Sequence, residues 1–179
     1  MIDPANLVAL LRDSAASFLD SFRGTTEPQF RFKPAPDRWS IAETAEHVIV
    51  AETGSSKLIR GKLLREIATA DQLAAAIGGE DRVDQRLAAM GKAFPAPDFV
   101  LPTGRWQTVR EMVEVFEESR GATIDFLLTS GVDLTKHVAP HPALGPLNGL
   151  QWGYFLVRHA ERHVGQIEAV KDDPNFPDA

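Results

Sequence analysis

Four long stretches of this chain place apolar residues three and four positions apart, which is the spacing of one face of an α-helix. No stretch shows the sustained alternation of apolar and polar residues that is typical of a half-buried β-strand. The first stretch follows Asp3 and Pro4, which suit the cap and the first position of a helix, and it stops near Gly24. The pattern therefore predicts an all-α protein, and four such helices are typical of a four-helix bundle.

The other three predicted helices share one start signal, a short polar residue followed three positions later by a glutamate or glutamine. The pairs are Ser40 with Glu43, Thr108 with Glu111 and Asn148 with Gln151. From the apolar stripes that follow, we expect the second helix to run to about Ala70 and the third to end near Gly131. The fourth should end at Asp173, because proline follows it.

The predicted helices are joined by segments of different length. Residues 25–38 contain three prolines, and we expect a loop there. Residues 71–104 form a long connection between the second and third helices, with a short helix over 82–90 and loops over 94–97 and 101–104. Residues 137–146 are rich in proline and are also expected to form a loop. No segment carries the signature of a β-hairpin.

Length, charge and cysteine content limit the function classes. A chain of 179 residues is expected to form one domain, residues 1–179. Its net charge of −6 argues against a nucleic-acid partner, which needs a basic face. No apolar run reaches the roughly 20 residues that span a membrane, and the N-terminus lacks a signal sequence, so we expect a cytoplasmic location. Since the chain has no cysteine, thiol chemistry would need a thiol cosubstrate.

Histidines on two predicted helices are the strongest functional signal. His159 and His163 are four residues apart, which places both imidazoles on one helix face. His47 lies on the inner stripe of the second helix, and the three together would make a three-histidine metal site. Such a set leaves a coordination position open for a reactant, as catalytic metal sites require.

Two well-known metal sites that use helical histidines do not match. Zinc metalloproteases place a glutamate directly after the first histidine of the pair, and Ala160 stands there in this chain. Di-iron carboxylate bundles need glutamate three residues before histidine, whereas Glu43 precedes His47 by four. Metal-free histidines in an ordinary core stay an alternative, although three buried imidazoles without partners would be costly.

Four further residues lie near these histidines in the predicted fold and have expected supporting roles. We expect His141, which lies between prolines, at the rim of a pocket rather than on the metal. Gln166, one turn beyond His163, either orients a ligand or is an ordinary polar residue at the helix seam. Glu43 is expected to serve as a capping partner, and Trp39 as a packing residue at the helix entry.

Taken in order, these motifs resemble the DinB-like (YfiT-like) superfamily of damage-inducible metalloenzymes, which is distinct from the DNA polymerase of that name. The matching residues are Trp39-Ser40-Ile41-Ala42-Glu43 with His47, His141-Pro142 with Gly145-Pro146-Leu147, and His159, His163 and Gln166. The resemblance covers nearly the whole chain, although residues 71–104 fit it less well. It implies a four-helix bundle, a homodimer, and a divalent metal held by His47, His159 and His163.

The resemblance also implies a reaction class. Members with assigned activities are mostly thiol-dependent transferases, isomerases or hydrolases, so we expect a metal-dependent S-transferase or hydrolase acting on a small molecule. Zinc or nickel suits three imidazoles best, and a low-molecular-weight thiol is the expected cosubstrate. The alternatives are a non-catalytic module that binds a metal or small ligand, and a metal-free scaffold that dimerises through the first and third helices. The sequence identifies no catalytic residue beyond the ligands.

Overall fold

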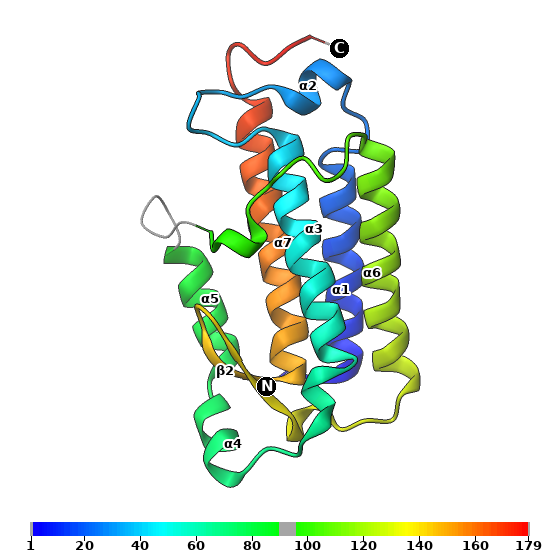
Figure 1. The fold of residues 1–179 in the computed structure, drawn as a ribbon, viewed down its shortest axis with the longest axis vertical. Coiled ribbons are helices and arrows are strands. Elements are labelled where there is room, and N and C mark those ends of the chain that lie inside the picture. The colour runs from blue at the N-terminus through cyan, green and yellow to red at the C-terminus, as the bar shows by residue number, and fades with distance from the viewer. Residues whose placement is uncertain (1, 90–95, 179) are drawn as a thin grey trace.

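The protein is described here by a computed structural model, which covers residues 2–89 and 96–178. Four long helices lie side by side and form a bundle, as Figure 1 shows. They are α1 (Pro4–Asp20), α3 (Ile41–Ile59), α6 (Val109–Thr129) and α7 (Gly149–Lys171). The predicted all-α four-helix bundle is confirmed, and the three predicted capping boxes begin α3, α6 and α7.

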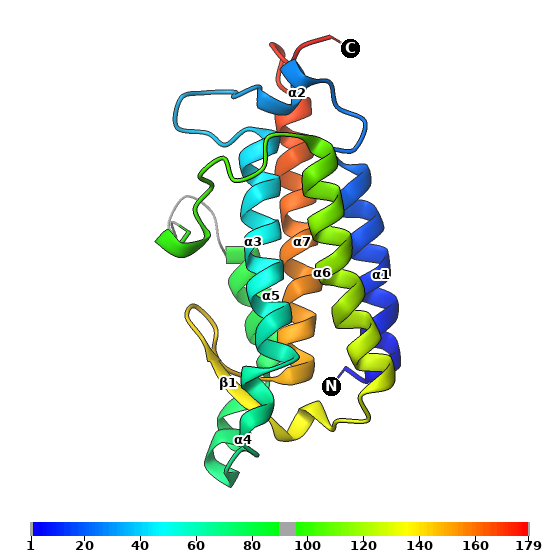
Figure 2. The ribbon, with the colours of Figure 1, turned by 45° about the vertical axis from the view of Figure 1, so that its right-hand side comes forward.

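The direction of the four helices explains the long connection. In Figures 1 and 2, α1 and α7 run upward while α3 and α6 run downward. Helix α3 packs against α6 and α7, and α1 packs against the same two helices. Because α3 and its neighbour α6 are parallel, the chain must return along the whole bundle between them. The predicted long connection between the second and third long helices makes this return.

Short elements fill the connections and correct several expectations. They are α2 (Glu27–Arg31), η1 (Lys62–Arg65), α4 (Ala70–Ala76), α5 (Gly79–Ala89), η2 (Asp98–Val100) and η3 (Leu134–Lys136). The loop expected over 25–38 contains α2, and α4 was not predicted. Helix α5 confirms the short helix expected over 82–90, although residue 90 lies outside the described part. The loop over 101–104 is confirmed, whereas residues 94 and 95 of the other expected loop are not described.

The second long helix ends earlier than expected. Helix α3 stops at Ile59, and the prediction that it reaches Ala70 was wrong. The cause is Gly61, whose φ of −144° and ψ of −85° fall outside the helical region. The apolar residues beyond Gly61 belong to a separate 3-10 turn. Their spacing happens to match that of the α3 stripe, so the sequence pattern predicted one continuous helix.

The prediction that no hairpin exists was also wrong. Strands β1 (Val138–His141) and β2 (Gly145–Asn148) pair antiparallel, with Pro140 opposite Pro146 and His141 opposite Gly145. Prolines cannot donate to a ladder, and the pairing survives because both strands are edges. Gly145 adopts a φ of +74° at the turn, which favours glycine. The hairpin leads directly into α7 beside the lower end of the bundle (Figure 2).

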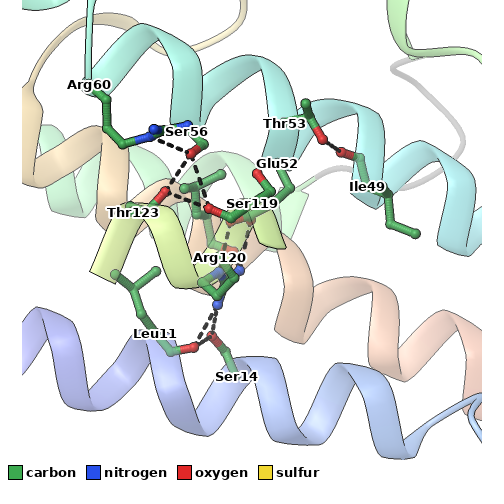
Figure 3. A network of polar contacts seen from close by, with 11 residues as sticks. Leu11, Ser14, Ile49, Glu52, Thr53, Ser56, Arg60, Ser119, Arg120 and Thr123 are labelled. Carbon is green, nitrogen blue, oxygen red and sulfur yellow. Dashed lines mark hydrogen bonds and ion pairs between the residues drawn. The ribbon is translucent and has the colours of Figure 1, made fainter. Parts of the chain in front are cut away.

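A polar layer crosses the centre of the bundle between two apolar clusters. Arg120 of α6 makes a two-pronged ion pair with Glu52 of α3, with both N···O distances at 2.8 Å. The same guanidinium donates to the Leu11 carbonyl and the Ser14 hydroxyl of α1, as Figure 3 shows, and to the Leu156 carbonyl of α7. One buried cation therefore joins all four long helices.

Candidate metal centre

Three buried histidines from two helices converge at one point. His47 comes from α3, and His159 and His163 come from successive turns of α7. The Nε2 atom of His159 lies 3.2 Å from His47 Nε2 and 3.2 Å from His163 Nε2. The potential ligand atoms of all three residues lie within 4.8 Å of one another. The structure therefore brings together the three residues that the sequence singled out.

The hydrogen bonds of the outer ring nitrogens show what this cluster needs. His47 Nδ1 donates to the Val100 carbonyl at 2.9 Å, and His163 Nδ1 donates to the Gln166 side-chain oxygen at 2.7 Å. Because a neutral imidazole carries one hydrogen, both Nε2 atoms then present lone pairs toward His159. A single N–H on His159 Nε2 cannot point at both lone pairs. One lone pair therefore faces the cluster without a donor or a positive charge to bind.

A divalent ion would supply that centre. Nitrogen ligands lie about 2.0–2.1 Å from zinc, so two of them on a tetrahedral ion are roughly 3.3 Å apart. The measured separation of 3.2 Å between neighbouring Nε2 atoms is close to this value. The donor set is therefore suited to a transition metal that accepts imidazole, and it brings no negative charge of its own.

Burial keeps the three rings neutral, as metal ligands must be. Burial lowers the pKa of His163 to about 3, with the nearby His47 adding to the effect. Burial also lowers the pKa of His159 well below its ordinary value. Burial lowers the pKa of His47 too, against the Val100 hydrogen bond that raises it. The side chain of Arg162 lowers the pKa of all three rings through its positive charge.

A cavity of about 840 Å³ opens in front of the histidines. His141 lines it, with its ring 4.5 Å from that of Phe155 and 4.9 Å from that of Trp152, so the expected rim position is confirmed. Its Nδ1 accepts the Ala143 N–H at 3.1 Å, which leaves that nitrogen no free lone pair. Trp39 both packs on His47, at 5.0 Å between rings, and lines the cavity.

The remaining two expectations separate clearly. Gln166 contacts His163, whose Nδ1 bonds its side-chain oxygen at 2.7 Å, and its role in orienting a metal ligand stays a prediction. Glu43 serves the helix start, where its carboxylate accepts the Ser40 N–H at 2.8 Å and pairs with Lys33. It does not line the cavity.

Comparison with known families agrees with the fold and the motifs. The sequence profile of the DinB superfamily matches residues 10–167. The chain belongs to the DinB superfamily. The structure adds that the motif histidines of this DinB-superfamily chain meet at one point in the fold.

Two relatives from Bacillus subtilis are similar over nearly the whole chain. The uncharacterized protein YuaE of strain 168 is 24% identical over 169 residues, covering 92% of this chain and 97% of its own. The solved structure of YfiT is 13% identical, with a TM-score of 0.60 over 99% of this chain and 92% of YfiT. YfiT is described as a probable metal-dependent hydrolase with an unusual four-helix bundle topology. At this identity the likeness shows the shared fold.

The sequence did not single out Glu46, which holds a loop of this DinB-superfamily chain against its histidines. One oxygen of the buried carboxylate accepts the Thr103 N–H at 2.8 Å, and the other accepts the Gly104 N–H at 2.8 Å. The same loop carries Val100, whose carbonyl receives the His47 hydrogen bond. The only sequence signal for this loop-holding role was that Glu46, a charged residue, stands next to His47 on an otherwise buried helix face.

Substituting Glu46→Gln should lower the affinity for a divalent metal by about 10–100-fold, which is typical when a partner that orients a ligand is lost. The amide would turn an NH₂ group toward backbone N–H groups, so the loop that holds His47 would loosen. Isothermal titration with zinc measures the change. The matched control is Glu43→Gln on the same helix, which should bind zinc like the wild type. Equal affinity of all three proteins would contradict this role.

Acid should destabilise the metal-free protein in part through His141, whose pKa burial lowers to about 4. In the unfolded chain, His141 binds a proton below about pH 6.5. In the folded protein, its imidazole stays neutral until about pH 4. The stability is therefore present above pH 6.5 and lost as the pH falls, by roughly 2 kcal/mol at pH 5. Urea unfolding at pH 7 and pH 5, with a chelator, should show a smaller loss for His141→Phe. An equal loss in both proteins would contradict the expectation.

The structure also bears on the membrane question. Among the described residues, none of the helices is long and apolar enough to cross a membrane.

Proposed function

We propose that this protein is a divalent-metal-dependent enzyme in which His47, His159 and His163 hold the ion. The observation that carries the proposal is the convergence of three neutral, buried imidazoles whose Nε2 atoms meet beside a cavity. The description of YfiT as a probable metal-dependent hydrolase supports it. Zinc or nickel is the proposed ion, because both accept imidazole ligands.

The openness of the site favours catalysis over a purely structural metal. Structural zinc sites are usually closed by four protein ligands. Among the described residues, only these three histidines form a cluster of the kind that could hold an ion. His141, the nearest further histidine, uses its Nδ1 as an acceptor for Ala143. A position toward the cavity would therefore be left for a reactant.

We propose hydrolysis or thiol transfer on a small molecule as the reaction. A divalent ion held here would act as a Lewis acid that lowers the pKa of a water or of a thiol cosubstrate. The chain supplies the rest: Val100 and Gln166 orient two of the rings, and Phe155 and Trp39 pack against the cluster and exclude water from its sides. With no cysteine in the chain, the nucleophilic sulfur of a thiol transfer would come from the cosubstrate.

Turnover assays with and without a thiol test the proposal. Zinc- or nickel-loaded protein should either hydrolyse p-nitrophenyl esters or join cysteine to 1-chloro-2,4-dinitrobenzene, and a chelator should abolish the activity. The His163→Ala variant should be inactive, whereas His137→Ala, remote from the cluster, should keep full activity. Turnover that survives chelation would contradict the proposal. Loss of thermal stability on chelation without any turnover would favour the non-catalytic module.

The oligomeric state and the location expected from the sequence stay predictions. A homodimer is expected and would be measured by sedimentation velocity of the purified protein. A cytoplasmic location is expected and would be measured by fractionation of the source cells.

A further inference from the structure

The charges that line the cavity have the opposite sign to the chain as a whole. The chain carries a net charge of −6. Among the described residues, the charged side chains around the cavity are those of Arg38, Arg86 and Arg162, against the single acid Asp37. A cavity lined by one sign of charge concentrates ligands of the other sign. The three neutral histidines add no negative charge to balance an ion bound between them.

Arg162 places its charge beside the histidines. It lies on α7 directly before His163, and its Nη1 donates to the Leu87 carbonyl of α5 at 2.7 Å. It is half-buried and lines the cavity together with the three histidines. An arginine held beside neutral ligands in this way is suited to attract a carboxylate through its charge.

Two uncharged polar side chains of the cavity, those of His141 and Gln166, offer hydrogens to a ligand. Since His141 Nδ1 accepts from Ala143, the neutral ring carries its hydrogen on Nε2. The side-chain oxygen of Gln166 is already taken by His163. The Thr44 hydroxyl gives its only hydrogen to the Ser40 carbonyl at 2.9 Å, so toward a ligand it can only accept. A ligand that supplies acceptors therefore matches His141 and Gln166.

The rest of the wall is apolar. Leu58, Leu87, Phe99, Trp152 and Phe155 line the cavity, whose volume of about 840 Å³ falls in the range of small-molecule sites. These side chains would cover an aliphatic or aromatic body. We infer that the substrate of the proposed metal site is a small carboxylate with an apolar body, and that its carboxylate pairs with Arg162. The inference rests on the proposed function for the site and adds the class of substrate.

Binding of matched acids and amides tests the inference. The probes are benzoate, phenylacetate and 4-phenylbutyrate, each compared with its own amide by isothermal titration at pH 7. At least one acid should bind about 10-fold or more tightly than its amide, since a hydrogen bond to a charged group is worth that much. The preference should hold in chelator-treated protein, because Arg162 does not need the metal. A preference without any metal binding would therefore leave this inference standing while the proposed function fails.

Variants on one helix locate the carboxylate. Arg162→Met should remove the preference for the acid and leave amide binding unchanged, whereas Arg162→Lys should keep part of it. The control is Arg158→Met one turn earlier, where the arginine pairs with Asp84 and Glu161 outside the cavity. That variant should bind the acid like the wild type. If no acid binds more tightly than its amide, or if Arg162→Met keeps the preference, the inference is wrong.

Discussion

Replacing Arg120 by methionine should lower the free energy of unfolding by about 3–5 kcal/mol, the usual loss when one partner of a buried ion pair is removed. Arg120 and Glu52 are 2% and 1% exposed, so the carboxylate left behind would be buried without its counter-charge. The hydrogen bonds to Leu11 and Ser14 would be lost as well. Urea unfolding of the purified variant measures the loss.

The double variant Glu52→Leu/Arg120→Met separates the pair from the rest of the layer. It should be more stable than Arg120→Met alone, because no buried charge remains. It should not regain the full stability of the wild type, since the Leu11 and Leu156 carbonyls still lack their donor. If Arg120→Met does not fold, the double variant and Glu52→Gln still report the coupling.

An exposed ion pair on the same helix provides the control. Arg110 pairs with Glu114 one turn along α6, at the surface. Arg110→Met should leave the unfolding midpoint close to that of the wild type, because exposed pairs contribute little. If Arg110→Met and Arg120→Met lost similar stability, the central role assigned to the buried pair would be incorrect.

Replacing His159 by alanine should weaken zinc or nickel binding by more than about 100-fold, beyond the usual effect of an orienting partner. Its Nε2 lies next to both other Nε2 atoms, so removing it leaves two ligands without the one between them. Without metal, the variant should be as soluble as the wild type and should keep the bundle. The imidazoles are neutral, and without an ion no bond at the centre of the cluster is lost when one of them is removed. The rise in melting temperature that metal gives the wild type should disappear.

His137→Ala is the matched control for this experiment. His137 bonds the Glu66 carbonyl at 2.8 Å and does not line the cavity. It should bind metal with wild-type affinity and show the same rise in melting temperature. If His159→Ala behaved like His137→Ala, the metal would have to lie elsewhere in the protein.

Local signals predicted the long helices well. Ser40, Thr108 and Asn148 each bond to the backbone three residues on, and a capping box needs only the chain around it. The end of α3 was missed because it depends on the backbone angles of Gly61, which the sequence does not state. The hairpin was missed because Pro140 and Pro146 pair across it, a use of proline that simple strand signals exclude.

The candidate site was predictable in part for the same reason. The spacing of His159 and His163 fixes their shared face on a helix, and the position of His47 on an apolar stripe predicted that it faces inward. The groups that orient the cluster come from far along the chain. Val100 is 53 residues from His47, and the loop that Glu46 holds is 57 residues away at Thr103. No local pattern predicts such pairs.

The buried ion pair of Arg120 and Glu52 was only weakly indicated by the sequence. Arg120 continues the apolar stripe of Met112 and Phe116 at intervals of four, so a charged residue stands where the bundle needs an inner side chain. Its partner Glu52 is likewise on the inner side of α3. Sequence could therefore have indicated a buried charge on each helix, although not that the two charges meet.

Elemental analysis of protein purified without an affinity tag tests the central claim most directly. The wild type should carry a single divalent ion per chain, zinc or nickel, and a His47→Ala variant purified in parallel should carry almost none. Far-ultraviolet circular dichroism of the variant should show that the bundle is intact. A wild type that holds no ion after incubation with zinc and nickel, or a His47→Ala variant that keeps the full amount, would contradict the proposed three-histidine metal site.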